Sequence, residues 1–223
     1  MSQTLLVATG NAHKREEIAA MLAPWGVTVE TTGDRGIASV EETGLTFVDN
    51  AILKAMSGYL AAGLSCLADD SGLAVDALDG APGVLSARFA GEPSDDAKNN
   101  AKLIRLLADV PAAARGAAFH SALALVVPKS VASRVSDDVR GAWTKSDHPE
   151  APDAVVFTVS GKVRGRIIDA ANGTGGFGYD PYFYYVEAGK TFAEMPAAAK
   201  HAVSHRGKAM AALNDLFEAL FRA

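Results

Sequence analysis

Hydrophobic positions along the chain follow two different periods. Short apolar runs typical of strands alternate with longer segments in which apolar residues recur at helical spacing. The first pattern predicts strands at residues 4–8, 27–31, 64–68, 73–77, 117–127, 155–160 and 163–169. The second predicts helices at residues 13–22, 46–61 and 94–109, and a last helix after Ser204. Because strands and helices alternate in this way, the chain is predicted to be an α/β protein.

The predicted helix at residues 46–61 carries polar residues beside its apolar stripe. Val48, Ile52 and Met56 recur at helical spacing, whereas Asn50 and Lys54 lie one turn apart on a neighbouring face. Lys54 is therefore expected to point to something other than the hydrophobic core.

Polar segments interrupt the pattern. Asp69-Asp70-Ser71-Gly72 is expected to separate two strands, Gly161-Lys162 to form the turn of a hairpin, and Ser94 to be the N-cap of the helix that follows it. Residues 129–152 are rich in Lys, Ser, Asp, Arg and Pro, which indicates a solvated excursion within one domain of residues 1–223 rather than a domain boundary.

Composition narrows the range of partners. With 21 Lys and Arg against 26 Asp and Glu, the net charge is −5, so general attraction to nucleic acid or to an anionic membrane is not expected. The single cysteine, Cys66, excludes an internal disulfide and is expected to be a small buried hydrophobic residue. No apolar run reaches the roughly 18 residues that span a bilayer. We expect a soluble, cytoplasmic protein.

The first candidate for chemistry is the segment at residues 9–15, which follows a predicted strand and opens a helix. His13, Lys14 and Arg15 lie in the first turn, where a cation costs up to about 1 kcal/mol against the helix dipole. Such a helix start is suited to holding an anion with its free N–H groups. An Asn11 cap with solvated Lys and Arg side chains explains the segment equally well.

The second candidate is a pair of acidic doublets, Glu41-Glu42 and Asp69-Asp70. Adjacent carboxylates repel each other, and a hard cation such as Mg²⁺ relieves that repulsion. Asp70 is expected at the carboxyl end of a strand, where open α/β sheets present functional groups. Taken alone, each doublet is better explained as turn residues in water. Together with an anion site, the doublets favour a metal between carboxylates and phosphates.

Two further candidates lie near the C-terminal end. Residues 173–178 contain the G-x-G-x-x-G spacing, but no helix is predicted to follow, which argues against a dinucleotide fingerprint and a dehydrogenase. The loop could instead present Phe177 or Tyr179 to a flat ligand, or pack on its own core. Lys200, His205 and Arg206 again place cations at a helix start, which favours a composite pocket over two coincidences; a structural role for His205 is the alternative.

Together these segments resemble inosine/xanthosine triphosphate pyrophosphatases, which hydrolyse deaminated purine nucleoside triphosphates. The resemblance spans nearly the whole chain. Its motifs, in chain order, are Thr9-Gly10-Asn11-x-x-Lys14, the segment 41–55 from Glu41-Glu42-Thr43-Gly44 to Lys54-Ala55, Ala68-Asp69-Asp70-Ser71-Gly72-Leu73, Gly80-Ala81-Pro82-Gly83 with Ser86-Ala87-Arg88, Gly176-Phe177-Gly178-Tyr179-Asp180-Pro181, and Lys200 with Ser204-His205-Arg206-Gly207.

The resemblance implies a fold, an activity and a set of roles. The fold would be a two-lobed mixed α/β fold with a long central sheet and a deep cleft between the lobes, in a homodimer. The activity would be Mg²⁺-dependent cleavage of the triphosphate into monophosphate and pyrophosphate. Asp70 would be the catalytic carboxylate, and Glu42 with Asp70 would hold the metal. The residues implied to bind substrate are Thr9, Gly10, Asn11, Ala12, His13, Lys14, Lys54 and Ser71 around the triphosphate, and Phe177, Gly178, Tyr179, Asp180, Lys200, His205 and Arg206 around the purine.

A module that binds a purine nucleotide without cleaving it is the rival interpretation. The acidic doublets discriminate between the two, because a protein that only binds polyanions has little use for converging carboxylates.

Overall fold

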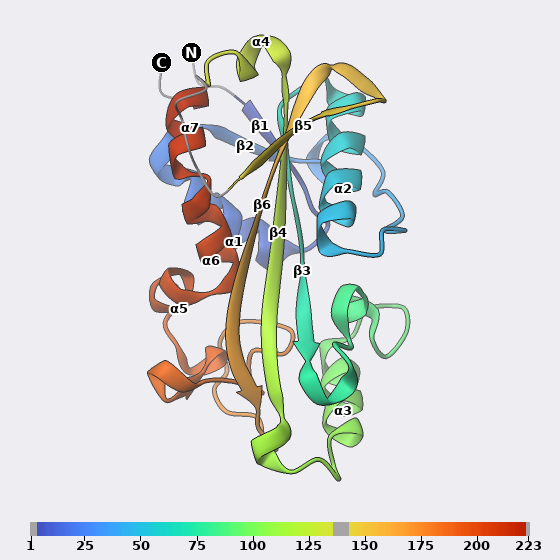
Figure 1. The fold of residues 1–223 in the computed structure, drawn as a ribbon, viewed down its shortest axis with the longest axis vertical. Helices are drawn as coiled ribbons and strands as arrows, with labels where there is room; N and C mark the ends of the chain where they lie inside the picture. Colours follow the sequence, from blue (N-terminus) through green and yellow to red (C-terminus); the bar gives the residue numbers. More distant parts are fainter. Residues whose placement is uncertain (1–3, 136–142, 222–223) are drawn as a thin grey trace. The chain divides into compact units, whose positions relative to one another are not determined.

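The computed structural model describes residues 4–135 and 143–221 and confirms a mixed α/β fold with a large sheet (Figure 1). Its strands are β1 (Thr4–Ala8), β2 (Thr28–Thr31), β3 (Cys66–Val75), β4 (Gly116–Pro128), β5 (Thr144–His148), β6 (Ala151–Ile167), β7 (Phe183–Tyr185) and β8 (Lys190–Thr191). Its helices are α1 (Ala12–Leu22), α2 (Phe47–Ala62), α3 (Asp96–Leu106), α4 (Lys129–Ala132), α5 (Ala197–Val203), α6 (His205–Ala212) and α7 (Asn214–Phe221). Among the described residues, no helix has both the length and the apolar character needed to cross a membrane.

The described residues divide into two compact units. The first comprises residues 4–70, 122–135, 143–160 and 208–221, and the second comprises residues 71–121 and 161–207. Three strands, β3, β4 and β6, contribute residues to both units.

The first unit is a sheet with helices on both faces. Its strand order is β2-β1-β3-β4-β6-β5, with β1 parallel to both β2 and β3 and β5 antiparallel to β6. Alternate residues of a strand point to opposite faces: Leu5 and Val7 of β1 pack with α1 and α7, whereas Leu6 packs with α2. Figure 1 shows α2 on one side of these strands and α1 and α7 on the other.

The second unit has an aromatic core. Its sheet is formed by parts of β3, β4 and β6 together with β7 and β8, in the strand order β3-β4-β6-β7-β8. Phe119 of β4 packs against Phe183 of β7 with 4.6 Å between ring centroids, and Phe192 stacks parallel to Phe119. Leu103 brings α3 onto this core. Tyr179 belongs to the same core cluster, so the loop at residues 173–180 is anchored to it.

Short polar side chains begin several helical segments. Asn11 is the N-cap of α1, as one of the two interpretations of its segment expects, and its side chain accepts a hydrogen bond from the N–H of Lys14. Thr191 and Glu194 form a capping box at the helical turn of residues 192–194. The Ser204 hydroxyl accepts a bond from the N–H of Gly207 at the start of α6. Short polar side chains at these positions satisfy N–H groups that a helix start leaves without partners.

The prediction of two strands flanking Asp69-Asp70-Ser71-Gly72 was wrong, because β3 runs through this segment without a break. Asp70 therefore lies inside a strand and not at its carboxyl end. Gly72 does not turn the chain; a Cβ there would collide with Ser86 and with the carbonyl of Gly83, so the glycine permits close packing. Tertiary contacts override the turn propensity of these residues.

The predicted hairpin at Gly161-Lys162 was also wrong, because β6 is one continuous strand. Gly161 and Val163 are buried while Lys162 and Arg164 are exposed, which continues the alternation of a strand with one wet face. The helix that follows Ser94 is capped by Asp95, whose side chain accepts from the N–H of Lys98.

Residues 129–152 contain more regular structure than expected. Helix α4 and strand β5 lie in this segment, and β6 begins within it, at Ala151. Strand β5 is almost fully exposed, which explains its polar sequence. Residues 136–142 lie outside the described residues. The predicted last helix consists of α6 and α7, and Met210, Leu213, Phe217 and Leu220 are buried there.

Candidate active site

A buried lysine lies between two carboxylates in the first unit. Lys54 Nζ donates to Glu42 Oε1 at 2.7 Å and to Asp70 Oδ1 at 2.8 Å. Thr46 begins α2 by accepting a hydrogen bond from the N–H of Asp49, and this start fixes the helix that carries Lys54. The helical pattern predicts that Lys54 lies outside the apolar stripe of its helix. The structure confirms this, because the Lys54 side chain contacts two acidic residues.

Burial changes the acid–base properties of this pair. The side chain of Lys54 is 14% exposed, and burial by itself would lower the pKa of its ammonium, but the carboxylates of Asp70 and Glu42 outweigh burial and hold that pKa above its usual value. Burial raises the pKa of the Asp70 carboxyl above its usual range, although Lys54 opposes this. The single ammonium group of Lys54 thus contacts two carboxylates and neutralises only part of their negative charge.

A second ion pair lies beside the first. Lys14 Nζ lies 3.0 Å from Asp69 Oδ2, and the Asp69 side chain has no exposed surface. The helix start at Asn11 directs Lys14 toward β3, whose two aspartates thus pair with two different lysines. The sequence motif predicts an anion as the partner of Lys14, whereas its partner in the structure is the carboxylate of Asp69.

Asn50 is the residue of this cluster that sequence analysis noticed without assigning to the site. It is fully buried, its Oδ1 accepts from the N–H of Gly44 at 2.7 Å, and its Nδ2 lies 3.5 Å from Asp70 Oδ2. Its position one turn before Lys54 on α2 was the available signal. Asn50 connects the loop that contains Glu42 to the strand that contains Asp70.

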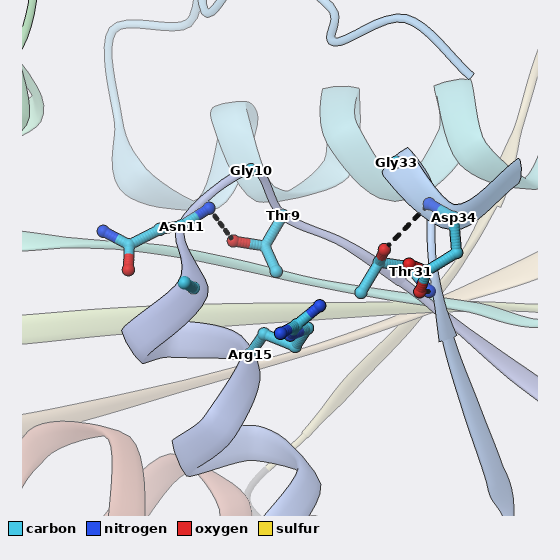
Figure 2. Close-up of a pocket in the computed structure, with 8 residues that line it drawn as sticks. Thr9, Gly10, Asn11, Arg15, Thr31, Gly33 and Asp34 are labelled. Carbon is cyan, nitrogen blue, oxygen red and sulfur yellow. Dashed lines mark hydrogen bonds between the residues drawn. The ribbon is translucent and has the colours of Figure 1, made fainter. Parts of the chain in front are cut away.

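The glycine loop before α1 lines a small pocket (Figure 2) of about 240 Å³. The Thr9 hydroxyl accepts from the N–H of Asn11 at 3.1 Å, and Arg15 points from α1 toward Thr31. Gly10 has open space where a Cβ would project, so the backbone here is accessible. The residues that line the pocket are Thr9, Gly10, Asn11, Ala12, Arg15, Thr31, Gly33 and Asp34. Sequence analysis did not single out the last three of these.

The carboxylate pair fits a divalent cation. Glu42 and Asp70 direct oxygens to a single cationic atom, Lys54 Nζ, and hard oxygen donors of this kind suit Mg²⁺. Among residues 4–135 and 143–221, no group of three or more His, Cys, Asp and Glu side chains could hold a metal ion by itself. Two carboxylates are what Mg²⁺ needs when phosphate oxygens and water complete its coordination.

The second unit holds an aromatic ring beside buried cations. Lys200 Nζ lies 2.7 Å from Asp180 Oδ2 and 5.0 Å from the centre of the Phe177 ring. The Arg206 guanidinium lies 5.9 Å from the same ring and donates to Ser71 Oγ at 2.9 Å. Lys200, Asp180 and Arg206 are all at least 96% buried, yet each retains a charged or polar partner.

The two aromatic residues of the loop at residues 173–180 differ in exposure. Tyr179 is buried and donates its hydroxyl to the carbonyl of Ser86, and burial raises its pKa well above the usual value. Phe177 is half-buried. Asp180 Oδ2 accepts from the N–H of Phe177, and Gly176 is required there because a Cβ would collide with the Asp180 carboxylate. Phe177 is thus the ring available to a ligand, and Tyr179 anchors the loop.

His205 stacks on a core aromatic ring. Its ring lies 4.8 Å from that of Phe119 with an interplanar angle of 13°, and it is 5% exposed. His205 therefore packs on the aromatic core of the second unit, directly before Arg206 in the chain.

The chain is thus an α/β protein whose first unit holds lysines beside carboxylates and whose second unit holds an aromatic ring beside buried cations. A sequence model of the Ham1 family matches residues 5–216, and the chain belongs to this family. The resemblance to triphosphate pyrophosphatases is confirmed by relatives: a dITP/XTP pyrophosphatase of Yersinia pseudotuberculosis is 44% identical over 213 residues, which are 96% of this chain and 97% of the relative.

Solved structures agree with this assignment. A HAM1 protein from Coxiella burnetii is 32% identical with a TM-score of 0.77, over 99% of this chain and 100% of that one. A nucleoside-triphosphatase and dITP/XTP pyrophosphatase from Mycobacterium abscessus is 41% identical with a TM-score of 0.69, over 95% of this chain and 99% of that one.

Proposed function

We propose that the protein hydrolyses deaminated purine nucleoside triphosphates, namely ITP, dITP and XTP, to the nucleoside monophosphate and pyrophosphate. The observation that carries the proposal is the buried Asp70, which lies with Glu42 around one lysine. A protein that only bound a polyanion would not bury carboxylates beside its lysines, because they would repel the ligand.

The triphosphate is assigned to the first unit. Lys54 and Lys14 supply positive charge, and Thr9, Gly10 and Asn11 offer N–H groups and short polar side chains at the start of α1. Ala12 and His13 open the same helix, and Ser71 follows Asp70 in the chain. Phosphate oxygens would compete with Asp69, Asp70 and Glu42 for the two ammonium groups.

Glu42 and Asp70 would hold Mg²⁺, which when bound would offset the charge that develops on the leaving pyrophosphate. Asp70 also accepts a hydrogen bond from the attacking water and orients it for in-line attack. Burial and the Glu42 charge raise the pKa of Asp70 toward the working pH, which makes its carboxylate a better proton acceptor than an exposed aspartate.

The purine is assigned to the second unit. Phe177 would stack on the base, and Gly178 leaves open space beside it. Lys200, His205 and Arg206 would donate to the 6-oxo group of hypoxanthine or xanthine, where adenine presents a donor of its own. Asp180 orients Lys200 and Phe177, and Tyr179 anchors the loop. Guanine shares the 6-oxo group, and its rejection requires that its 2-amino group find no partner.

Pyrophosphate release from ITP, XTP, GTP and ATP, measured with Mg²⁺ and with EDTA, tests the proposal. We expect rapid release from ITP and XTP, little from ATP, and none in EDTA. Orthophosphate as the first product would contradict the proposed cleavage position, and tight binding of ITP without any cleavage would favour a nucleotide-binding module instead.

The family resemblance also predicts a homodimer. Size-exclusion chromatography with light-scattering detection should give twice the mass of the 23.1 kDa chain. A monomer across the working concentration range would contradict this prediction without affecting the proposed chemistry.

A further inference from the structure

Helix α3 binds Gly178 at both its N–H and its C=O. Asp96 Oδ2 accepts from the N–H of Gly178 at 2.7 Å, and Asn100 Nδ2 donates to the carbonyl of Gly178 at 2.9 Å. Asp96 and Asn100 lie one turn apart and thus project from one face of the helix. Because Gly178 has a φ of +62°, in the left-handed region, two contacts on one residue fix a conformation that a free loop would leave readily.

Neither residue caps the helix, although Asp96, as an aspartate in the first turn, also suits the helix dipole. The N-cap of α3 is Asp95, so Asp96 is not required as a cap. Asn100 is 91% buried, asparagine is a poor helix former, and its Oδ1 has no hydrogen-bond partner among the described residues. A buried amide that is only partly satisfied costs stability, and the contact that Asn100 gains in return is the one with Gly178.

Gly178 is the neighbour of the ring assigned to the purine. The N–H of Gly178 belongs to the peptide group that it shares with Phe177, so Asp96 binds the backbone directly after that ring. Asp180 accepts from the N–H of Phe177. The peptide group before Phe177 is therefore bound by Asp180, and the peptide groups on both sides of Gly178 are bound by α3.

We propose that Asp96 and Asn100 are positioning residues for the base-stacking ring: by fixing Gly178 they hold Phe177 in place before the purine arrives. The proposal rests on the function proposed above. A preorganised ring loses less conformational entropy on binding, so the clamp lowers KM for purine triphosphates and leaves kcat nearly unchanged. Since Asp96 is the charged partner, it contributes more than Asn100.

Hydrogen exchange tests the clamp without relying on activity. We expect the amides of residues 176–180 to exchange faster in Asp96→Ala than in the wild type, and at an intermediate rate in Asp96→Asn, whose neutral amide oxygen can still accept from Gly178 but more weakly. Asp95→Ala is the matched control, because it removes the cap of α3 and leaves both contacts with Gly178. Unchanged exchange in Asp96→Ala, or equally fast exchange in Asp95→Ala, would overturn the clamp.

Steady-state kinetics with ITP test its consequence. Loss of one charge-assisted hydrogen bond predicts that KM rises about tenfold in Asp96→Ala, with kcat within about twofold and with partial recovery in Asp96→Asn. Asn100→Leu, which removes the donor and the unsatisfied oxygen together, should raise KM about threefold without lowering thermal stability. No change in KM in Asn100→Leu would overturn the role of Asn100.

A double-mutant cycle separates positioning from general damage. In a Phe177→Ala background, Asp96→Ala should change KM less than about twofold, because the ring that it positions is gone. An undiminished effect in that background would overturn the proposal. If the wild type releases no pyrophosphate from ITP, the proposed function and the predicted gain in purine affinity both fail, whereas the exchange experiment still decides whether α3 holds the loop.

Discussion

Lys54 Nζ lies 2.8 Å from Asp70 Oδ1, and this contact joins α2 to the middle of β3. Glu42 binds the same ammonium at 2.7 Å, so one positive charge faces two carboxylates. The excess negative charge is buried, which is unfavourable for the folded protein without a ligand. A divalent cation would correct the balance, and a substrate phosphate would then replace the carboxylates as partners of Lys54.

Replacing Asp70 by Asn should leave the fold intact and abolish most of kcat for ITP, because an amide is nearly isosteric but carries no charge and accepts no proton. Circular dichroism and pyrophosphate release would check the two halves of this expectation. Asp79→Asn is the matched control, since Asp79 is exposed with a φ of 50°, a conformation that asparagine tolerates. Retention of more than about a tenth of kcat, a loss below roughly 1.4 kcal/mol, would remove Asp70 from the centre of the reaction.

The same substitution should stabilise the metal-free protein at neutral pH. Burial raises the pKa of Asp70, so the folded state binds its proton more tightly than the unfolded state does. Stability contributed in this way is complete below the unfolded pKa and is lost as pH rises through the higher folded pKa. In EDTA, Asp70→Asn should therefore melt at a higher temperature than the wild type at pH 7.5, and the difference should shrink toward pH 4. A lower melting temperature at pH 7.5 would show that the Lys54 contact outweighs burial.

Glu42→Gln should raise the Mg²⁺ concentration needed for half-maximal activity, by about tenfold if one charged oxygen ligand is weakened by roughly 1.4 kcal/mol. The neutral amide also leaves Lys54 with Asp70 as its remaining carboxylate partner in this cluster. Glu41→Gln, at an exposed neighbouring position, is the control and should follow the wild-type Mg²⁺ titration. Equal Mg²⁺ curves for both variants would assign the metal to other residues.

Local signals placed the predicted helix starts within two residues of the observed ones, whereas the breaks in the strands were predicted wrongly. The Asn11 cap, one of two interpretations of its segment, could be recognised because its side chain bonds to an N–H group three residues away. The cap of α3 was predicted at Ser94, one residue before the observed cap, Asp95. The continuity of β3 through Asp70 depends on lysines that are distant in sequence and on close packing at Gly72. Interactions of this kind cannot be predicted from the secondary-structure propensities of neighbouring residues.

In the candidate site, too, residues in sequence motifs were predicted, whereas contacts between distant segments were not. Glu42, Lys54 and Asp70 were proposed together from motifs, and the structure brings these three into contact. The contacts of Asp96 and Asn100 with Gly178 were not predicted, because they join residues 82 and 78 positions apart. Nothing in the residue types of α3 indicates which loop its polar face will meet.

Cys66 should be inert to thiol reagents in the folded protein. The residue is completely buried, and burial raises the pKa of its thiol to about 12, so the reactive thiolate is scarce at pH 8. A disulfide exchange reagent such as Ellman's reagent should therefore detect no thiol in native protein and one per chain in denaturant. Rapid labelling of the native protein would show that the sheet around Cys66 opens readily.

Base choice should depend on Arg206 and not on Phe177. The Arg206 fork reaches Ser71 in the second unit and lies near the Phe177 ring, so it is placed to donate to a carbonyl on a stacked base. Arg206→Ala should lower kcat/KM for ITP more than for ATP, by about 1–3 kcal/mol of lost discrimination, because adenine offers no acceptor of this kind at position 6. Phe177→Ala should weaken both substrates alike, since stacking does not distinguish the bases. Exposed Arg105→Ala on α3 controls for loss of charge. An equal loss on ITP, XTP and ATP in Arg206→Ala would reassign Arg206 to the phosphates.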